Sequence, residues 1–291
     1  MEALVAWLDE RLAAAGIARI GEVTRPRERP WGTVLTAPTT AGAVWLKIPG
    51  RQTRYEVPLY QVLTRVVPDD VPRVIAADVE HGRLLLADGG LPLDGPDAMA
   101  AALPIYGRLQ RALAPHVDAL LAAGVPDMRP AVMPQRFDEA VAAIARRVEH
   151  DDDREVLGRV AAMRPAFAGW CELLAASAVP TSLDHNDLHA RNVLTRGDGT
   201  LLFHDWGDSV VAHPFTSMLA GPADRAARDA YLRVFADLAP HAELVAELAI
   251  ACRVARAARA LTWDRALGPP DQTVEPRFAR APLEILAGLL D

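Results

Sequence analysis

The sequence predicts an α+β protein in which a small antiparallel sheet precedes a mainly helical region. The first third of the chain carries short segments rich in Val, Thr, Ile and Trp that are separated by Pro, Gly and Thr turns, a pattern typical of antiparallel strands. A turn-forming segment follows at 88–96, and nearly everything after it is helix rich in Ala and Leu, apart from residues 181–210. We therefore expect a first lobe at 1–88 and a second lobe at 89–291.

The first lobe is expected to begin with a helix over residues 2–15, because Leu4, Leu8 and Leu12 recur at helical spacing. The β-branched and apolar segments that follow predict strands, and one helical segment interrupts them. The expected strands are 20–25, 32–38, 42–48, 72–78 and 82–87, and the expected helix is 53–65.

Lysine is used once in this chain. All but one of its 31 basic residues are arginines, and the exception is Lys47. A lone lysine in such a background indicates a position that needs a compact ammonium group rather than a guanidinium fork. Within the expected strand 42–48, the alternation of side chains places Val44, Leu46 and Ile48 on one face. It places Trp45 and Lys47 together on the other face.

The composition is typical of a globular protein, with 51% hydrophobic and 24% charged residues. The N-terminal residues lack the pattern of a secretory signal, and three arginines interrupt the apolar stretch 244–263, which predicts an amphipathic helix rather than a membrane span. Cys171 and Cys252 are far apart in the sequence and are expected to be buried thiols in a reducing compartment. A net charge of −7 argues against nucleic acid as the partner and mildly favours a cationic ligand. We expect a cytoplasmic protein without a membrane partner, monomeric or weakly dimeric.

The residues with catalytic potential are concentrated between positions 181 and 210. Asp187 and Asn192 lie in one short loop, and Asp205 follows an apolar strand after a Gly-Asp-Gly turn. Phosphoryl transfer requires metal ions on the phosphates and an acceptor for the proton of the attacking hydroxyl, but little covalent help from the protein. Asp187 and Asn192 can supply a base and a neutral oxygen ligand. Asp205 can supply a hard anionic ligand for Mg²⁺.

A family resemblance rests on two motifs, which are His185-x-Asp187-x-x-x-x-Asn192 and Asp205-Trp206-Gly207. Both are similar to the catalytic and metal-binding loops of aminoglycoside phosphotransferases and related kinase-like small-molecule kinases. The resemblance implies a two-lobed, protein-kinase-like fold that binds ATP or GTP with Mg²⁺ in the cleft between the lobes. It also implies that Asp187 is the catalytic base and that Asn192 and Asp205 bind the metal. The phosphate acceptor would be a hydroxyl group of a small molecule, such as an aminoglycoside, an amino sugar or a similar polar alcohol.

The resemblance also assigns nucleotide-binding residues to the first lobe. Lys47 takes the place of the family's phosphate-binding lysine, and Glu56 on the next helix is its expected ion-pair partner. Leu86 and Ala87 lie in the strand-to-hinge segment whose backbone binds the purine. Trp45, on the same face as Lys47, is expected to lie beside the purine ring.

Two features of related kinases are missing, and other functions stay open. The turn at 29–33 has one glycine instead of a glycine-rich loop, and no activation segment follows Asp205, which argues against a protein substrate. A catalytically weak, nucleotide-binding pseudokinase and a metal-dependent hydrolase are the alternatives. The hydrolase would use a cluster of histidines and aspartates, namely His185, Asp187, His189, His204 and Asp205. His185 is expected to brace the loop, whereas His189 and Asp208 could serve either the active site or the local turns.

Overall fold

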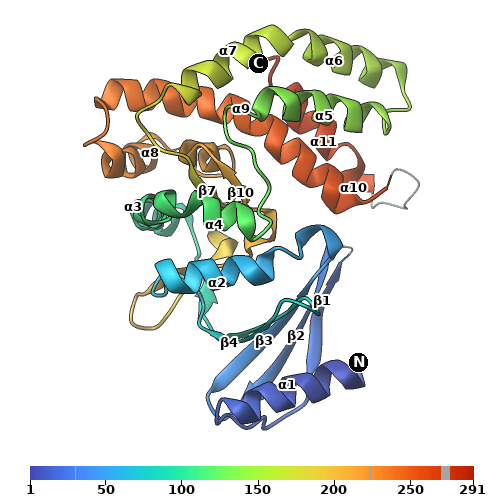
Figure 1. The fold of residues 1–291 in the computed structure, drawn as a ribbon, viewed down its shortest axis with the longest axis vertical. Coiled ribbons are helices and arrows are strands. Elements are labelled where there is room, and N and C mark those ends of the chain that lie inside the picture. The colour runs from blue at the N-terminus through green and yellow to red at the C-terminus, as the bar shows by residue number, and fades with distance from the viewer. Residues whose placement is uncertain (30, 223, 270–275) are drawn as a thin grey trace. The chain divides into compact units, whose positions relative to one another are not determined.

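The computed structural model describes residues 1–29, 31–222, 224–269 and 276–291, and Figure 1 labels its elements. The chain forms two compact units, each built from segments that are separate in the sequence. Unit 1 comprises Met1–Asp94, Ala122–Val125 and Ala190–Gly207, and unit 2 comprises Gly95–Leu121, Pro126–His189 and Asp208–Asp291. The expected lobe boundary between residues 88 and 89 stays a prediction.

Unit 1 is built on a five-stranded antiparallel sheet with the order β1-β2-β3-β5-β4. Its strands are β1 Thr24–Arg29, β2 Gly32–Thr39, β3 Gly42–Pro49, β4 Val74–Asp78 and β5 Arg83–Ala87, and its helices are α1 Glu2–Ala14 and α2 Glu56–Val66. Figure 1 shows α1 and α2 on opposite sides of this sheet. Both helices predicted for this region are confirmed, and so are four of the five predicted strands.

The predicted strand at 20–25 is wrong, because the first strand begins at Thr24 and ends at Arg29. Ahead of it, the backbone of Arg19 forms an isolated β-bridge with Thr39. The strand itself reads Thr-Arg-Pro-Arg-Glu-Arg, and all of its residues are exposed at the edge of the sheet. An edge strand tolerates proline and charged residues because part of its backbone has no neighbouring strand. Its sequence therefore lacks the apolar alternation by which strands are predicted.

The hydrophobic core of unit 1 lies between α1 and one face of the sheet. Its buried members are Leu8, Leu12, Leu35, Ala37, Val44, Leu46 and Leu85. The alternation predicted for β3 is confirmed, since Val44 and Leu46 are buried in this core whereas Trp45 is exposed. The face of β3 that points away from the core carries Lys47, whose side chain contacts α2.

Replacing Leu46 by alanine should strongly destabilise the protein. Leu46 is fully buried at the centre of the core between α1 and the sheet. A Leu→Ala change at such a site costs about 2–5 kcal/mol, because transfer energy is lost and a cavity remains. The free energy of unfolding from denaturant titration is the measurement. Leu91→Ala, at a leucine that is largely exposed, is the control and should change it by less than about 0.5 kcal/mol. Equal effects of the two changes would contradict this description of the core.

A second sheet in unit 1 supports the segment from 192 to 205. Its strands are β6 Leu91–Pro92, β8 Val193–Thr195 and β9 Leu201–Phe203, in the order β6-β8-β9. The expected linker 88–96 therefore also contributes a short strand. Gly90, just before β6, has a φ of +99°, and a Cβ atom there would lie 2.1 Å from the carbonyl oxygen of Thr195. Only glycine can occupy this position without displacing the neighbouring strand.

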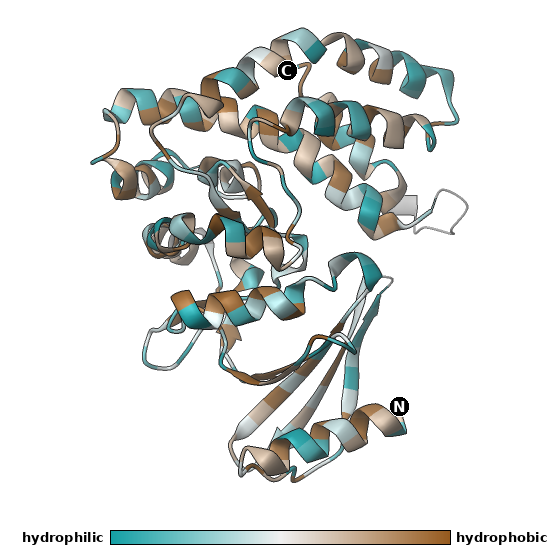
Figure 2. Cartoon of the chain, viewed as in Figure 1, coloured by the Kyte–Doolittle hydropathy of each residue, from teal (hydrophilic) through white to brown (hydrophobic). Residues whose placement is uncertain are grey.

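The chain after residue 95 is mainly helical, as predicted. Its helices are α3 Pro96–Leu113, α4 Val117–Ala122, α5 Met133–Ala145, α6 Asp151–Ala162, α7 Arg164–Ala175, α8 Arg225–Leu232, α9 His241–Leu267, α10 Pro276–Ala279 and α11 Ala281–Ala287. Strands β7 Ser182–Asp184 and β10 Val210–Ala212 form a two-stranded antiparallel sheet in unit 2. Figure 2 shows polar and apolar residues interspersed along these helices. None of the described helices combines the length and the apolar character that crossing a membrane would need.

Candidate functional site

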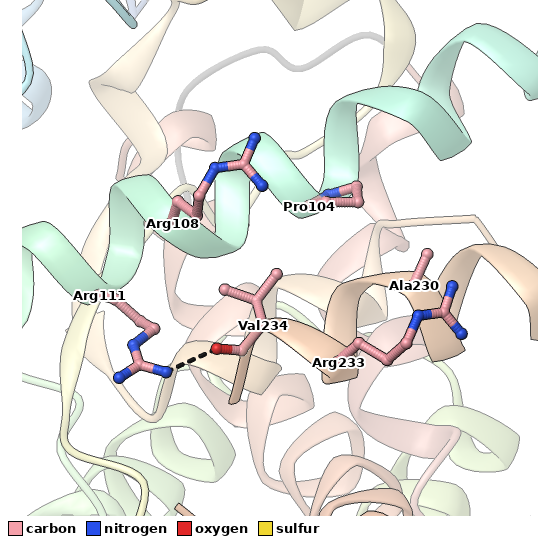
Figure 3. A pocket seen from close by; sticks show the side chains of 6 residues that line it. All are labelled: Pro104, Arg108, Arg111, Ala230, Arg233 and Val234. Atoms are coloured by element: carbon pink, nitrogen blue, oxygen red, sulfur yellow. Dashed lines mark hydrogen bonds between the residues drawn. The ribbon is translucent and has the colours of Figure 1, made fainter. Parts of the chain in front are cut away.

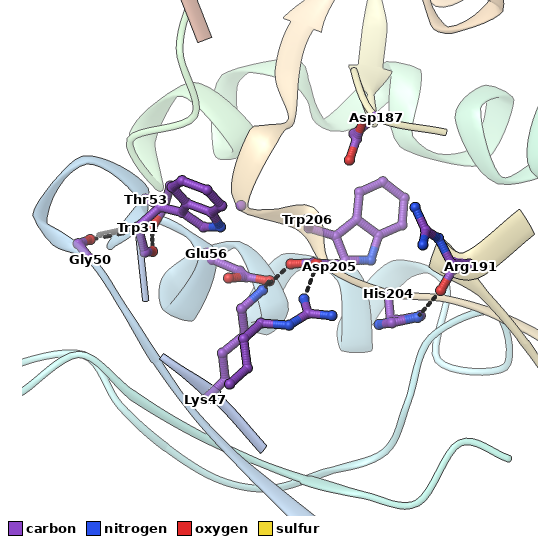
Figure 4. A network of polar contacts seen from close by, with 12 residues as sticks. Trp31, Lys47, Gly50, Thr53, Glu56, Asp187, Arg191, His204, Asp205 and Trp206 are labelled. Carbon is purple, nitrogen blue, oxygen red and sulfur yellow. Dashed lines mark hydrogen bonds and ion pairs between the residues drawn. The ribbon is translucent and has the colours of Figure 1, made fainter. Parts of the chain in front are cut away.

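The ammonium group of Lys47 lies between two carboxylates of unit 1 (Figure 4). Its Nζ atom donates to Oε1 of Glu56 at 2.6 Å and also to Oδ1 of Asp205. The three side chains come from β3, from the first turn of α2 and from the segment after β9. The two residues expected to form an ion pair are therefore in contact. Asp205 joins them although 158 positions separate it from Lys47 in the sequence.

Burial and neighbouring charges together set the pKa values of Lys47 and Glu56. Burial disfavours the ammonium form of Lys47, but the charges of Asp205 and Glu56 outweigh burial and raise its pKa above the ordinary value. Burial raises the pKa of Glu56 to about 7, although its contact with Lys47 acts in the opposite direction. Lys47 is therefore cationic at neutral pH. Because 19% of its side chain is exposed, part of this charge remains accessible to an anionic ligand.

The hairpin of β8 and β9 positions Asn192 and Asp205. Asn192 ends the short 3₁₀ helix η3 Ala190–Asn192 directly before β8, and Asp205 follows β9. The N–H group of His204 donates to the carbonyl oxygen of Asn192 at 3.1 Å and so joins the two ends of the hairpin. Asp205 has a φ of 64°, a left-handed conformation that Asp adopts more readily than most residues.

These two side chains fit a hard cation by their donor chemistry. Mg²⁺ usually takes one or two protein carboxylates and fills its other positions with waters and substrate phosphates. The carboxylate of Asp205 is partly exposed, and Asn192 is only 6% exposed, so this amide is held in place. Among the described residues, no group of three or more His, Cys, Asp or Glu side chains is arranged so that it could hold a metal ion.

A buried polar network in unit 2 fixes the loop that leads to Asp187. The carboxylate of Asp184, at the end of β7, accepts a hydrogen bond from the N–H group of Asn186 at 2.7 Å. It also accepts from the hydroxyl groups of Thr216, at 2.7 Å, and Ser217, which both lie on the 3₁₀ helix η5 Pro214–Leu219. Asn186 has a φ of 59°, so the backbone turns sharply just before Asp187. A satisfied network of this kind rigidifies its surroundings.

The two histidines near Asp187 have different surroundings. His185 is fully buried, and its backbone N–H group donates to the hydroxyl group of Tyr106 at 2.9 Å. This hydrogen bond comes from the backbone, so the bracing role expected for the side chain of His185 stays a prediction. His189 is more exposed, and its Nε2 atom lies 3.4 Å from Oδ2 of Asp187.

A cation that the sequence analysis missed also contacts Asp187. Arg259 on α9 donates from Nη2 to Oδ1 of Asp187, and from Nη1 to Oδ2 of Asp208 at 2.7 Å. Burial opposes the charge on Asp187, but the hydrogen bond with His189 and the charge of Arg259 outweigh burial and lower its pKa. The carboxylate of Asp187 is therefore ionised at neutral pH.

A second arginine was also missed. Nη1 of Arg27, on the edge strand β1, lies 3.7 Å from Oδ2 of Asp205. In a chain so rich in arginine, neither Arg27 nor Arg259 is distinguished by its residue type. The only sequence signal for Arg259 was its spacing from Arg253 and Arg256, which indicated an amphipathic helix and nothing more.

The residues expected to contact a purine lie on adjacent strands of unit 1. Trp45 on β3 pairs with Leu86 on β5, and 37% of the tryptophan is exposed. The N–H group of Ala87, at the end of β5, donates to the carbonyl oxygen of Arg73 at 2.9 Å. This N–H group is therefore already used within unit 1, and the contact of the Ala87 backbone with a purine stays a prediction. Unit 1 contains all the predicted nucleotide and metal residues, which are Trp45, Lys47, Glu56, Leu86, Ala87, Asn192 and Asp205, whereas Asp187 belongs to unit 2.

A pocket of about 570 Å³ on unit 2 contains none of these residues (Figure 3). Its lining comes from α3, α8 and the 3₁₀ helix η6 Arg233–Phe235, and it consists of Pro104, Arg108, Arg111, Ala230, Arg233 and Val234. Arg111 donates to the carbonyl oxygen of Val234 at 2.6 Å and pairs with Asp237. This pocket is therefore separate from the candidate site.

Comparison with solved structures identifies proteins of similar architecture, whereas no protein-family model matches the sequence and no curated protein matches it significantly. The wild-type aminoglycoside 2'-phosphotransferase-IIIa in complex with GDP is similar with a TM-score of 0.64 and 13% identity, over 98% of this chain and 97% of that chain. Choline kinase LicA from Streptococcus pneumoniae is similar with a TM-score of 0.64 and 16% identity, over 98% and 99%. Macrolide 2'-phosphotransferase MphH from Brachybacterium faecium is similar with a TM-score of 0.59 and 16% identity, over 96% and 97%.

These similarities extend over nearly the whole of each chain. The chain has the fold of small-molecule phosphotransferases. The expected two-lobed, protein-kinase-like α+β architecture is thereby confirmed, and so is the resemblance to aminoglycoside phosphotransferases at the level of the fold.

Proposed function

We propose that the chain is a Mg²⁺-dependent phosphotransferase that moves the γ-phosphoryl group of ATP or GTP to a hydroxyl group of a small molecule. The observation that carries this proposal is the cation of Lys47, which is held between Glu56 and Asp205 in a phosphotransferase fold. The acceptor would be an aminoglycoside, an amino sugar or a similar polar alcohol, because structures of this fold are named for acceptors of this kind.

Lys47 would neutralise the phosphates that are not transferred. A compact ammonium group suits this role because it binds phosphate as a point charge. Glu56 is fully buried on α2 and would keep the ammonium group in place when a nucleotide arrives. Asp205 now shares the same ammonium group, so a metal ion bound by Asp205 and the phosphates bound by Lys47 would be neighbours.

Asp205 and Asn192 would hold the metal ion. When bound, Mg²⁺ would neutralise the charge that develops on the phosphate oxygens during transfer. Asn192 and Asp205 lie at the two ends of the hairpin of β8 and β9, and Asp205 has a left-handed backbone conformation.

Asp187 would accept the proton of the attacking hydroxyl group. The contacts with His189 and Arg259 keep this carboxylate ionised at neutral pH, which a base requires. Trp45 would stack against the purine of the same nucleotide. Trp45 and Lys47 are two apart on β3, and residues two apart on a strand project to the same side about 6–7 Å from each other. This places an exposed indole next to the phosphate-binding Lys47.

The direct test incubates the protein and Mg²⁺ with γ-labelled ATP or GTP and a panel of aminoglycosides, amino sugars, nucleosides and amino alcohols, and separates the products by chromatography. We expect label on one class of hydroxyl acceptor, and none without Mg²⁺. Nucleotide binding without transfer to any acceptor would favour the pseudokinase alternative. Metal-dependent hydrolysis that needs no nucleotide would favour the hydrolase alternative.

Lys47→Arg tests the assignment of the phosphate-binding cation. The change keeps the charge but replaces the ammonium group by a larger planar group, which displaces the bound phosphates. We expect kcat to fall by about 10²-fold in a folded protein, the effect of misplacing reacting groups by about 1 Å. Glu56→Ala should do less harm, because Lys47 keeps its contact with Asp205. A fully active Lys47→Arg protein would show that the single lysine has no special role.

A further inference from the structure

Arg259 connects two aspartates of unit 2 that lie far from it in the sequence. Its guanidinium group contacts Oδ1 of Asp187 through Nη2 and Oδ2 of Asp208 through Nη1 at 2.7 Å. Only 14% of the side chain is exposed, so the contacts are largely shielded from water. An arginine that divides its donors between two carboxylates fixes the separation of those groups through its rigid planar fork.

The position of Arg259 is itself fixed by the residues around it on α9. Its guanidinium carbon lies 5.7 Å from the ring centre of Trp263, one turn further along the helix, in a cation–π contact. The hydroxyl group of Thr262, on the same helix, accepts a hydrogen bond at 2.9 Å from the side-chain amide of Asn186, which directly precedes Asp187. The same amide donates to the carbonyl oxygen of Asp208 at 3.1 Å. Helix α9 thus holds the loop of the proposed base at two points.

We propose that Arg259 is a positioning residue that orients the carboxylate of Asp187 toward the acceptor hydroxyl, an inference that rests on the proposed phosphotransferase function. A general base acts only within hydrogen-bond reach of the proton that it removes, so the angle of its carboxylate matters. The carboxylate has two oxygens, and Arg259 occupies Oδ1. The fork of Arg259 therefore limits the rotation of the carboxylate, whose other oxygen, Oδ2, lies 3.4 Å from Nε2 of His189.

The charge of Arg259 also affects the pKa of Asp187. The titratable and charged groups that face Asp187 are His185 and His189 from its own loop and Arg259 from α9, with Asp208 on the far side of the guanidinium group. Removing the arginine takes away a cation, so the pKa of Asp187 should rise. A base works only when it is ionised, and its activity is lost as the pH falls through its pKa. The acidic limb of the pH profile should therefore move to higher pH.

The kinetic test compares Arg259→Ala and Arg259→Lys with Arg253→Ala. Arg253 lies on the same helix, is exposed, and contacts the ring of Trp170 instead of the loop, so it is a matched control. We expect Arg259→Ala to lower kcat by about 10²-fold with little change in KM for the nucleotide. Arg259→Lys should recover part of this loss, because it restores the charge without the fork. Arg253→Ala should have normal kinetics. A kcat of Arg259→Ala within about twofold of the parent protein, or a loss confined to KM for the nucleotide, would overturn the proposal.

Two titrations test the role of Arg259 independently of the proposed phosphotransfer activity. The pH profile of kcat/KM should show the acidic limb about one pH unit higher in Arg259→Ala, as expected for loss of one adjacent cation. Carbon-13 NMR of labelled aspartate carboxylates, assigned with Asp187→Asn, follows the same carboxylate without any substrate. If the carboxylate titrates at the same pH with and without Arg259, the proposal is wrong, whatever the activity. If its pKa moves as expected but no acceptor is ever phosphorylated, Arg259 controls Asp187 and the proposed phosphotransfer is wrong.

Discussion

Asp187→Asn should lower kcat by about 10²–10⁴-fold, which is the usual contribution of a positioned general base. Asparagine has nearly the same shape as aspartate, and its carbonyl oxygen can still accept a hydrogen bond from Arg259. The carboxylate of Asp184 is unchanged in this variant and still accepts from Asn186 and Thr216, so it should hold the loop in the same conformation. We therefore expect a folded protein that binds nucleotide normally but transfers phosphate slowly.

The measurements are kcat with the acceptor found by the panel and the Kd of the nucleotide by calorimetry. Asp152→Asn, at an exposed residue in the first turn of α6, is the matched control and should change neither. Because the pKa of Asp187 is lowered, its ionisation should not limit the parent enzyme near neutral pH. Turnover within a few fold of the parent protein in Asp187→Asn would remove this residue from the mechanism.

Local sequence patterns were sufficient to predict most of the sheet in unit 1. The alternation around β3 depends on a few consecutive residues, and it correctly separated the buried Leu46 from the exposed Trp45. The same logic failed for β1, whose six exposed residues include no core position. That strand exists because β2 pairs with it, and pairing with a neighbour is not encoded in its own hydrophobic pattern.

The candidate site could be predicted only in part, for a related reason. The family motif identified Asp187, Asn192 and Asp205, and the scarcity of lysine identified Lys47. The contact between Lys47 and Asp205 joins positions that no local spacing relates. Arg259 lies in no motif. Its position within the helical sequence is like that of an ordinary arginine on a helix surface. Only the fold, which brings α9 against the loop of the proposed base, distinguishes it from the others.

Asp205→Ala should abolish turnover and also remove the effect of Mg²⁺ on nucleotide binding. Asp205 is the anionic member of the proposed pair of metal ligands, and the amide of Asn192 alone offers no charge to hold the ion. A metal ion at the transferring group contributes several kcal/mol to stabilisation of the transition state, and about 1.4 kcal/mol corresponds to a tenfold change in rate. We therefore expect kcat to fall by at least about 10³-fold. The protein should remain folded, because Lys47 keeps Glu56 as a partner when Asp205 is removed.

The decisive measurement is the Kd of ATP, or of GTP, with and without Mg²⁺. In the parent protein Mg²⁺ should tighten binding, whereas in Asp205→Ala the two values should be equal. Asp198→Ala is the control, because Asp198 is exposed in the turn of the same hairpin, where its carboxylate accepts a hydrogen bond from the backbone N–H group of Thr200 at 2.9 Å. It should respond to Mg²⁺ as the parent protein does. If Asp205→Ala still transfers phosphate normally, or still binds nucleotide more tightly with Mg²⁺, then the metal is held elsewhere. The contact of Asp205 with Lys47 would in that case serve only to neutralise a buried cation.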